Sequence, residues 1–329
     1  MSRTFELYLE SPHELKLREV EPLAAPKDHE VKIKVIYGGI CGSDLKVYKG
    51  KISYAKYPLR PGHEVLGTIV EAGAATPYQV GTHVTIFPNT FCGKCEFCLN
   101  GKINICANKE PLGVSIDGLF GQQIVIDSKY VVPVPEKVSN ERAVLTEPFA
   151  VIVHALKKVK INQETTVAVI GCGTEGLLTA TLALRKGAKL TVIDVNPNKL
   201  ELAKRLGEVQ ARQPEEIKDQ RFDIVIEAAG VKSSMEQALE IVKPGGTMLA
   251  LGINADPVDL YPMHLVRSEI TIKGSIIYSL EDFTDALEYL SDPALNIEPV
   301  VSKMYSYTEF QEAFEAALSG NFAKIVLKF

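Results

Sequence analysis

Hydrophobic and polar residues alternate along the first 135 positions in short stretches that Gly, Pro and Asp interrupt. The clearest stretch covers residues 30–37, and shorter ones cover residues 67–71 and 82–86. Alternation with a period of two places one face of a strand against a core and leaves the other face outside. The pattern therefore predicts a β-rich unit over about residues 4–135.

The rhythm changes after residue 164, where short apolar runs alternate with segments of helical periodicity. Strands are expected at 165–170, 189–194, 222–227 and 247–251, and helices between them at 175–186, 198–206 and 234–242. Strands that are joined by helices form a parallel sheet with both faces covered. The second unit is therefore expected to be a doubly wound α/β domain.

The part of the chain after residue 279 completes the expected organisation. Two amphipathic helices are expected at 280–290 and 307–318, and the alternation over 324–329 suits a strand that returns to the first unit. The fold class is thus α/β, with a β-rich domain at 1–148 and 282–329 and a doubly wound domain inserted at 149–281. Because no Pro/Ser-rich tether separates the units, we expect a rigid hinge around residues 145–160.

Composition narrows the class of partner. The 329 residues exceed what one hydrophobic core usually supports, and 46% hydrophobic and 23% charged residues are typical of a globular protein. The net charge of -5 predicts neither a nucleic acid nor an anionic membrane as partner. The sequence shows neither a secretory signal nor an apolar run of roughly 20 residues that could cross a bilayer. We expect a cytoplasmic protein that acts on a small molecule.

Four of the six cysteines lie within fifteen positions, in the run Cys92-x-x-Cys95-x-x-Cys98-x7-Cys106. One tetrahedral cation satisfies four such thiolates at once, whereas close neighbours pair poorly as disulfides. The pattern predicts a zinc ion, which would be structural because four thiolates leave no position for substrate. An iron–sulfur cluster also takes four thiolates and is the alternative.

A glycine-rich run, Gly171-Cys-Gly-Thr-Glu-Gly176, follows a predicted strand and opens a predicted helix. In that context the glycines allow a tight turn and a close approach of pyrophosphate to the helix N-terminus. Asp194 follows Gly171 by 23 positions (194 − 171), which is near the distance of a carboxylate that binds ribose. Its charge would repel a 2′-phosphate, so NAD is favoured over NADP. The expected cofactor residues at the loop are Gly171, Gly173, Thr174, Glu175 and Gly176; a plain glycine turn with a capping Asp is the alternative.

A second group of residues is scattered over the β-rich unit. Cys41, His63, Glu64 and Glu147 together offer one thiolate, one imidazole and two carboxylates. Any one of them alone is more often a structural residue than a ligand. As a set they suffice for a three-ligand zinc with an open position for a substrate oxygen.

Taken in order, these motifs resemble the zinc-dependent medium-chain dehydrogenases/reductases of the alcohol dehydrogenase superfamily, in the branch with sorbitol, threonine and butanediol dehydrogenases. The matching motifs are G-I-C-G-S-D at 39–44, P-G-H-E at 61–64, the four-cysteine run, E-P at 147–148 and the glycine-rich run followed by Asp194. The resemblance covers nearly the whole chain. It implies a GroES-like catalytic domain, an inserted Rossmann domain, NAD, one catalytic and one structural zinc per subunit, and a homodimer or homotetramer.

The resemblance also implies roles for single residues. Cys41 and His63 would bind the catalytic zinc, while Glu64 and Glu147 are the candidates for the remaining ligand and a supporting carboxylate. Ser43 would take the substrate proton and Asp44 would steady the site. Lys199 would bind the adenosine ribose, with a solvated lysine as the alternative. Tyr48 would line the substrate pocket, with packing in the core as the alternative. His154 is expected to pack at the start of a helix rather than to bind metal.

The sequence departs from the family pattern at two positions and adds a basic run. Lys46 stands where many alcohol dehydrogenases continue a proton relay with histidine, and Ile277 stands where sorbitol dehydrogenases carry an arginine that holds the sugar. Sorbitol itself is therefore not predicted. The basic residues from Lys46 to Arg60 are expected to be a solvated face, with recognition of an anionic substrate as the alternative.

The predicted function is reversible hydride transfer between NAD and a secondary alcohol, on a polyol, sugar acid or related hydroxylated molecule. The alternative substrates are L-threonine and simple vicinal diols. A protein of another class, a non-catalytic NAD-binding sensor with structural zinc alone, would leave the set of Cys41, His63, Glu64 and Glu147 unexplained. Two zinc ions per subunit would indicate the enzyme, and one would indicate the sensor.

Overall fold

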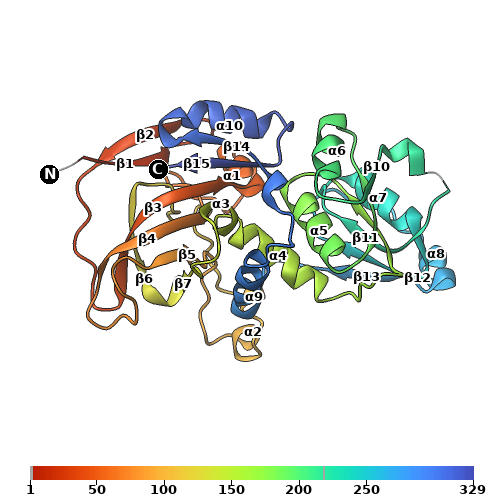
Figure 1. Cartoon of the computed structure of the whole chain (residues 1–329), viewed down its shortest axis with the longest axis horizontal. Coiled ribbons are helices and arrows are strands. Elements are labelled where there is room, and N and C mark those ends of the chain that lie inside the picture. The colour runs from red at the N-terminus through yellow and green to blue at the C-terminus, as the bar shows by residue number, and fades with distance from the viewer. Residues whose placement is uncertain (1–2, 218) are drawn as a thin grey trace.

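A computed structural model describes residues 3–217 and 219–329 and contains two lobes that lie side by side (Figure 1). The N-terminal part of the chain fills one lobe, and the C-terminal part returns to it. The middle of the chain forms the other lobe. We call these the β-rich lobe and the parallel-sheet lobe.

The β-rich lobe is organised around β3 (Glu30–Ile40), which pairs antiparallel with β4 (Glu64–Ala72) and β15 (Lys324–Lys328). Its alternate residues Val31 and Ile33 are fully buried, as the period of two predicts. The larger sheet has the order β14-β15-β3-β4-β5-β7, with β6 also paired to β3, and β1 and β2 form a second sheet. The other elements of this lobe are β1 (Thr4–Leu9), β2 (Leu15–Val20), β5 (His83–Ile86), β6 (Gln123–Asp127), β7 (Val131–Pro133), β14 (Val301–Ser306), α1 (Gly42–Tyr48), α2 (Glu96–Leu99), α3 (Asn140–Ala143) and α10 (Phe310–Leu318).

The parallel-sheet lobe has six parallel strands in the order β10-β9-β8-β11-β12-β13. The chain order of strands and helices confirms the predicted doubly wound α/β unit. Its elements are β8 (Thr166–Ile170), α5 (Thr174–Arg185), β9 (Lys189–Ile193), α6 (Pro197–Lys204), β10 (Val209–Arg212), β11 (Phe222–Glu227), α7 (Lys232–Ile241), β12 (Val242–Ala250), α8 (Pro262–Ser268) and β13 (Thr271–Gly274). The edge strands β10 and β13 were not predicted, because each has four residues and carries no apolar run.

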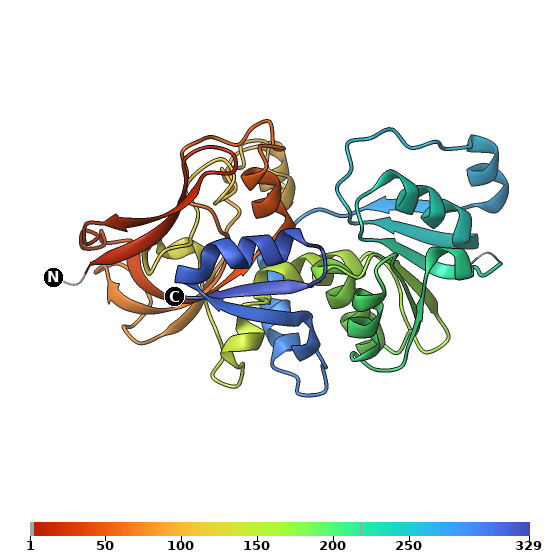
Figure 2. The same ribbon diagram turned by 90° about the horizontal axis from the view of Figure 1, so that it is seen from above.

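The two lobes share one hydrophobic core, to which α4 (Thr146–Leu156) contributes. Seen from above, separate stretches of the chain connect the lobes (Figure 2). Phe87, Phe149 and Leu178 belong to this continuous cluster. The second connecting helix, α9 (Leu280–Leu290), packs beside α4. The predicted domain boundaries at 148/149 and 281/282 fall inside these two helices and stay a prediction.

His154 lies in the last turn of α4, so its predicted place at the start of a helix is wrong. The helix begins at Thr146, several residues before the expected start, because the E-P dipeptide lies within its first turn. The ring of His154 contacts Asp282 on α9 at 2.7 Å. Among the described residues, no helix has the length and apolar character that a membrane span requires.

Candidate active site

Three of the predicted zinc ligands converge where α1 and β4 begin. Cys41 directly precedes α1, and His63 and Glu64 stand at the start of β4. The ligand atoms of these three side chains lie within 4.8 Å of one another. A thiolate, an imidazole and a carboxylate at this spacing fit a divalent zinc ion.

Asp44 stands directly behind these ligands. Its carboxylate accepts the backbone N–H of Cys41 at 2.8 Å and that of Gly62 at 3.2 Å. His63 Nδ1 lies 3.3 Å from Asp44 Oδ1, in a geometry that forms no hydrogen bond. Burial alone would lower the pKa of His63, but the charge of Asp44 raises the pKa well above its ordinary value.

Ser43 lies beside the same imidazole. Its Oγ is 3.4 Å from His63 Nε2, so a hydroxyl is available beside the ligand group, as the proton-transfer role requires. Tyr48 is packed against other aromatic rings rather than standing free in a pocket. Its ring packs against His13 and Phe314, with ring centroids 5.0 and 5.6 Å apart. Its predicted contact with substrate stays a prediction.

Glu64 is paired with a buried cation that the sequence analysis did not identify. Lys324 Nζ lies 2.7 and 2.6 Å from the two Glu64 carboxylate oxygens and also donates to the carbonyl of Ile40 at 3.1 Å. Both side chains are buried, with 0% and 1% of Glu64 and Lys324 exposed. The signal that could have revealed Lys324 is a lysine that opens the apolar run of β15.

Glu147 lies outside the group of converging ligand atoms. Its carboxylate accepts the hydroxyl of Tyr278 at 2.6 Å, and Asn89 Nδ2 donates to the same hydroxyl at 3.2 Å. Burial is the main cause that raises the pKa of Glu147 to about 7; the charge of His63 opposes this rise and that of Glu64 adds to it. Glu147 therefore interacts electrostatically with His63 and Glu64. Sequence reasoning missed both Tyr278 and Asn89.

The four-cysteine run folds into a single cluster, as predicted. The four sulfurs lie within 4.8 Å of one another, and two of the separations, Cys95–Cys106 and Cys106–Cys92, are 3.9 and 3.6 Å. Sulfurs on one tetrahedral zinc are roughly 3.8 Å apart for Zn–S bonds of about 2.3 Å. This spacing fits one ion better than a larger iron–sulfur cluster. The backbone N–H of Lys94 is the main cause that lowers the pKa of Cys92 to about 6, which favours its thiolate.

The glycine-rich run forms the turn between β8 and α5. Gly171 has φ 99°, and a Cβ on Gly176 would lie 1.7 Å from the carbonyl oxygen of Gly171, so both positions require glycine. A Cβ on Gly173 would meet nothing within 4 Å, which leaves open space at the helix N-terminus. This turn can accept a pyrophosphate in the expected way.

Asp194 and the first turn of α5 lie beside the glycine-rich turn. Asp194 accepts the backbone N–H of Cys172 at 2.6 Å and that of Asn196 at 2.8 Å, which fixes its carboxylate beside the glycine-rich turn. Thr174 Oγ1 donates to the carbonyl of Ala323 at 3.0 Å, next to Lys324. This contact places the turn against the strand that carries the partner of Glu64. Burial raises the pKa of the neighbouring Glu175 carboxyl.

The remaining candidate residues have different surroundings. Lys46 Nζ lies 3.4 Å from the carbonyl of Ile253, so this lysine joins the two lobes. Arg60 is held by Glu6 and the carbonyl of Gly118, so this part of the basic run is used inside the fold. Lys199 lies on α6, after the turn that holds Asp194.

Comparison with known proteins gives matches over both lobes. The model of the alcohol dehydrogenase GroES-like domain matches residues 27–136, and that of the zinc-binding dehydrogenases matches residues 176–292. A sorbitol dehydrogenase of Halalkalibacterium halodurans is 31% identical over 322 residues, covering 93% of this chain and 94% of the relative. D-arabinitol dehydrogenase 1 of Uromyces fabae is 33% identical over 341 residues, covering 98% and 96%. A solved zinc-binding dehydrogenase of Sinorhizobium meliloti 1021 with bound NADP is 27% identical, with a TM-score of 0.93 and 100% of both chains covered.

Proposed function

Since the chain belongs to the zinc-dependent medium-chain dehydrogenases, with a GroES-like and a Rossmann domain, and acts on the CH–OH group of polyols, we propose a reversible NAD-dependent reaction at Cys41, His63 and Glu64. The observation that carries the proposal is the convergence of these three ligand atoms within 4.8 Å. The contact between Thr174 and Ala323 supports it, because it puts the cofactor turn beside the same site.

Each of these side chains has a separate role in the proposed reaction. Cys41, His63 and Glu64 would hold a zinc ion, whose positive charge lowers the pKa of a substrate hydroxyl. Asp44 holds the backbones of Cys41 and Gly62 and places a negative charge 3.3 Å from the His63 ring. Ser43 Oγ would relay the proton that the hydroxyl loses, taking it up while it releases its own proton to water. The glycine-rich turn and Asp194 would hold the dinucleotide, whose ring would supply the hydride acceptor.

Counting zinc and screening substrates tests the proposal. We expect about two zinc ions per subunit, one from each ligand cluster, and NAD reduction with a member of a panel of polyols, sugar acids and their phosphates. The panel also includes L-threonine and vicinal diols, the alternative substrates. One zinc per subunit together with NAD binding but no turnover would instead support the non-catalytic sensor.

The proposed preference for NAD over NADP depends on Asp194. We expect Asp194→Ser to raise the Kd of NADH relative to that of NADPH by at least about tenfold, because the variant loses a ribose acceptor and the repulsion of a 2′-phosphate. Fluorescence titration with both reduced cofactors measures the ratio. Asp259→Ser removes an exposed carboxylate from the same lobe and is the control. An unchanged ratio in Asp194→Ser would contradict the assignment.

We also propose a homo-oligomer in the cytoplasm. Edge strand β13 pairs with β12 on one side, and large apolar side chains around it are exposed: Tyr261, Met263, Val266 and Ile272. An exposed sheet edge next to apolar side chains favours pairing with a second copy. The six cysteines are free, which fits a reducing compartment.

A further inference from the structure

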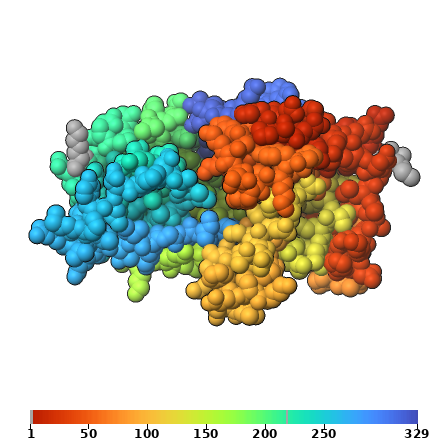
Figure 3. All heavy atoms as spheres, turned by 180° about the vertical axis from the view of Figure 1, so that it is seen from behind, coloured from red at the N-terminus to blue at the C-terminus, as the bar shows by residue number. Residues whose placement is uncertain are grey.

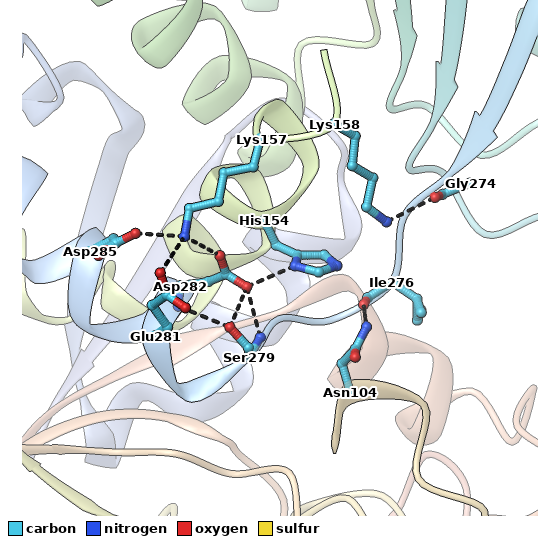
Figure 4. A network of polar contacts seen from close by, with 10 residues as sticks. All are labelled: Asn104, His154, Lys157, Lys158, Gly274, Ile276, Ser279, Glu281, Asp282 and Asp285. Carbon is cyan, nitrogen blue, oxygen red and sulfur yellow. Dashed lines mark hydrogen bonds and ion pairs between the residues drawn. The ribbon is translucent and has the colours of Figure 1, made fainter. Parts of the chain in front are cut away.

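A short crossing segment, residues 274–279, carries the chain from β13 back to α9 and is held from two sides (Figure 4). On one side, Lys158 Nζ at the end of α4 donates to the carbonyl of Gly274 at 3.0 Å. On the other, Asn104 Nδ2 donates to the carbonyl of Ile276 at 3.1 Å. The segment is therefore fixed by groups that lie more than 110 positions away in the sequence.

The C-terminal end of the crossing segment is anchored more strongly still. Asp282 accepts from Ser279 Oγ, His154 Nδ1 and Lys157 Nζ, each at 2.7 Å (Figure 4). These contacts keep the pKa of Asp282 well below its ordinary value despite its burial. Because α4 supplies two of the three donors, the start of α9 cannot shift without breaking charged hydrogen bonds.

Between the anchors, Ile277 has a left-handed backbone with φ 54°. A β-branched residue rarely adopts this conformation, which costs free energy unless the surroundings hold it. The residue before Ile277 is the one that Asn104 holds, and the residue after it is Tyr278, whose hydroxyl reaches Glu147 at 2.6 Å. Ile277 thus lies between the residue that Asn104 holds and Tyr278, which contacts Glu147 in the active site.

Asn104 belongs to the four-cysteine loop, where it lies in the 3-10 helix Ile103–Ile105 just before Cys106. Its own carbonyl accepts Lys109 Nζ at 3.1 Å. In the space-filling view this part of the chain projects from the β-rich lobe (Figure 3). The projecting loop therefore touches the crossing segment through a side chain that lies two positions before Cys106.

We propose that Asn104 is a positioning residue: by holding the carbonyl of Ile276 it keeps the Tyr278 hydroxyl on Glu147, so that the four-cysteine loop sets the geometry of a carboxylate in the active site. The inference rests on the proposed function and extends it. The loop then has a role in the reaction besides its metal cluster. Asn89, which donates to the Tyr278 hydroxyl, supports the same arrangement from the base of the loop.

The test compares Asn104→Asp, which keeps the shape but loses the amide donor, with Asn100→Asp in the same loop. Asn100 Nδ2 donates to the carbonyl of Glu96 and so stays within the loop. In the zinc-loaded enzyme, Asn104→Asp is expected to lower kcat about fivefold with an unchanged KM for NAD, since one hydrogen bond is lost. Hydrogen exchange of residues 274–279 should become faster in Asn104→Asp, while Asn100→Asp should match the parent enzyme in both measurements.

A double-mutant cycle with Tyr278→Phe separates positioning from a general structural effect. If Asn104 acts through Tyr278, adding Asn104→Asp to Tyr278→Phe should lower kcat no further. Additive effects, an unchanged kcat, or faster exchange without a change in kcat would each overturn the proposal. Hydrogen exchange needs no turnover, so a parent enzyme that is inactive on every substrate would refute the proposed function and leave the exchange result interpretable.

Discussion

Replacing Cys41 by serine is expected to lower kcat by at least about a thousandfold while the Kd of NADH stays the same. Cys41 supplies the thiolate among the three converging ligand atoms, and a serine hydroxyl is a poor zinc ligand at neutral pH. Loss of an active-site metal removes several kcal/mol of charge stabilisation, and ~4 kcal/mol corresponds to about a thousandfold. The residues proposed to bind the cofactor belong to the other lobe and are not altered.

Three measurements on the Cys41→Ser variant establish the cause. Zinc should fall from about two ions to one per subunit, because the four-cysteine cluster is untouched. NADH fluorescence should report an unchanged Kd, and the melting temperature should show a folded protein. Retained turnover, or loss of both zinc ions, would refute the assignment of Cys41.

The second large effect is expected from Lys324→Met. Removing the cation leaves Glu64 buried and unpaired, which costs about 3 to 5 kcal/mol of unfolding free energy. For a lobe of this size the melting temperature should fall by roughly 10 °C. The fall should be larger after chelation of zinc, because a bound ion would balance part of the Glu64 charge.

Two further variants control the Lys324 experiment. Lys328→Met removes an exposed lysine from the same strand and should leave the melting temperature nearly unchanged. Glu64→Gln combined with Lys324→Met removes both charges and should recover much of the lost stability. If the double variant were as unstable as Lys324→Met, packing at Lys324 rather than its charge would explain the effect.

Local patterns in the sequence predicted most of the fold. The period of two in β3, the helix and strand alternation after Glu164, and the glycine-rich turn each depend on neighbouring residues, so each is visible in the sequence. The four cysteines are close in sequence and proved close in space. The edge strand β13, by contrast, is defined by its pairing with β12 rather than by its own composition.

The site was only partly predictable for the same reason. Cys41, His63 and Glu64 form a cluster as the motifs indicate, but Glu147 is held by Tyr278, which lies 131 positions away. The partner of Glu64 is Lys324, at a distance of 260 positions. Such pairings follow from how the two lobes and the returning strand assemble, and no local period encodes them.

The return of β15 into the larger sheet, between β14 and β3, also affects the order in which the lobes fold during biosynthesis. Strand β15 lies between β14 and β3 and brings the cation for Glu64, yet the ribosome makes it after the whole parallel-sheet lobe. Domains of newly made chains fold as units while synthesis proceeds. The parallel-sheet lobe can therefore fold while the sheet of the β-rich lobe is incomplete and Glu64 still lacks its cation. The β-rich lobe is completed only when β15 has left the exit tunnel.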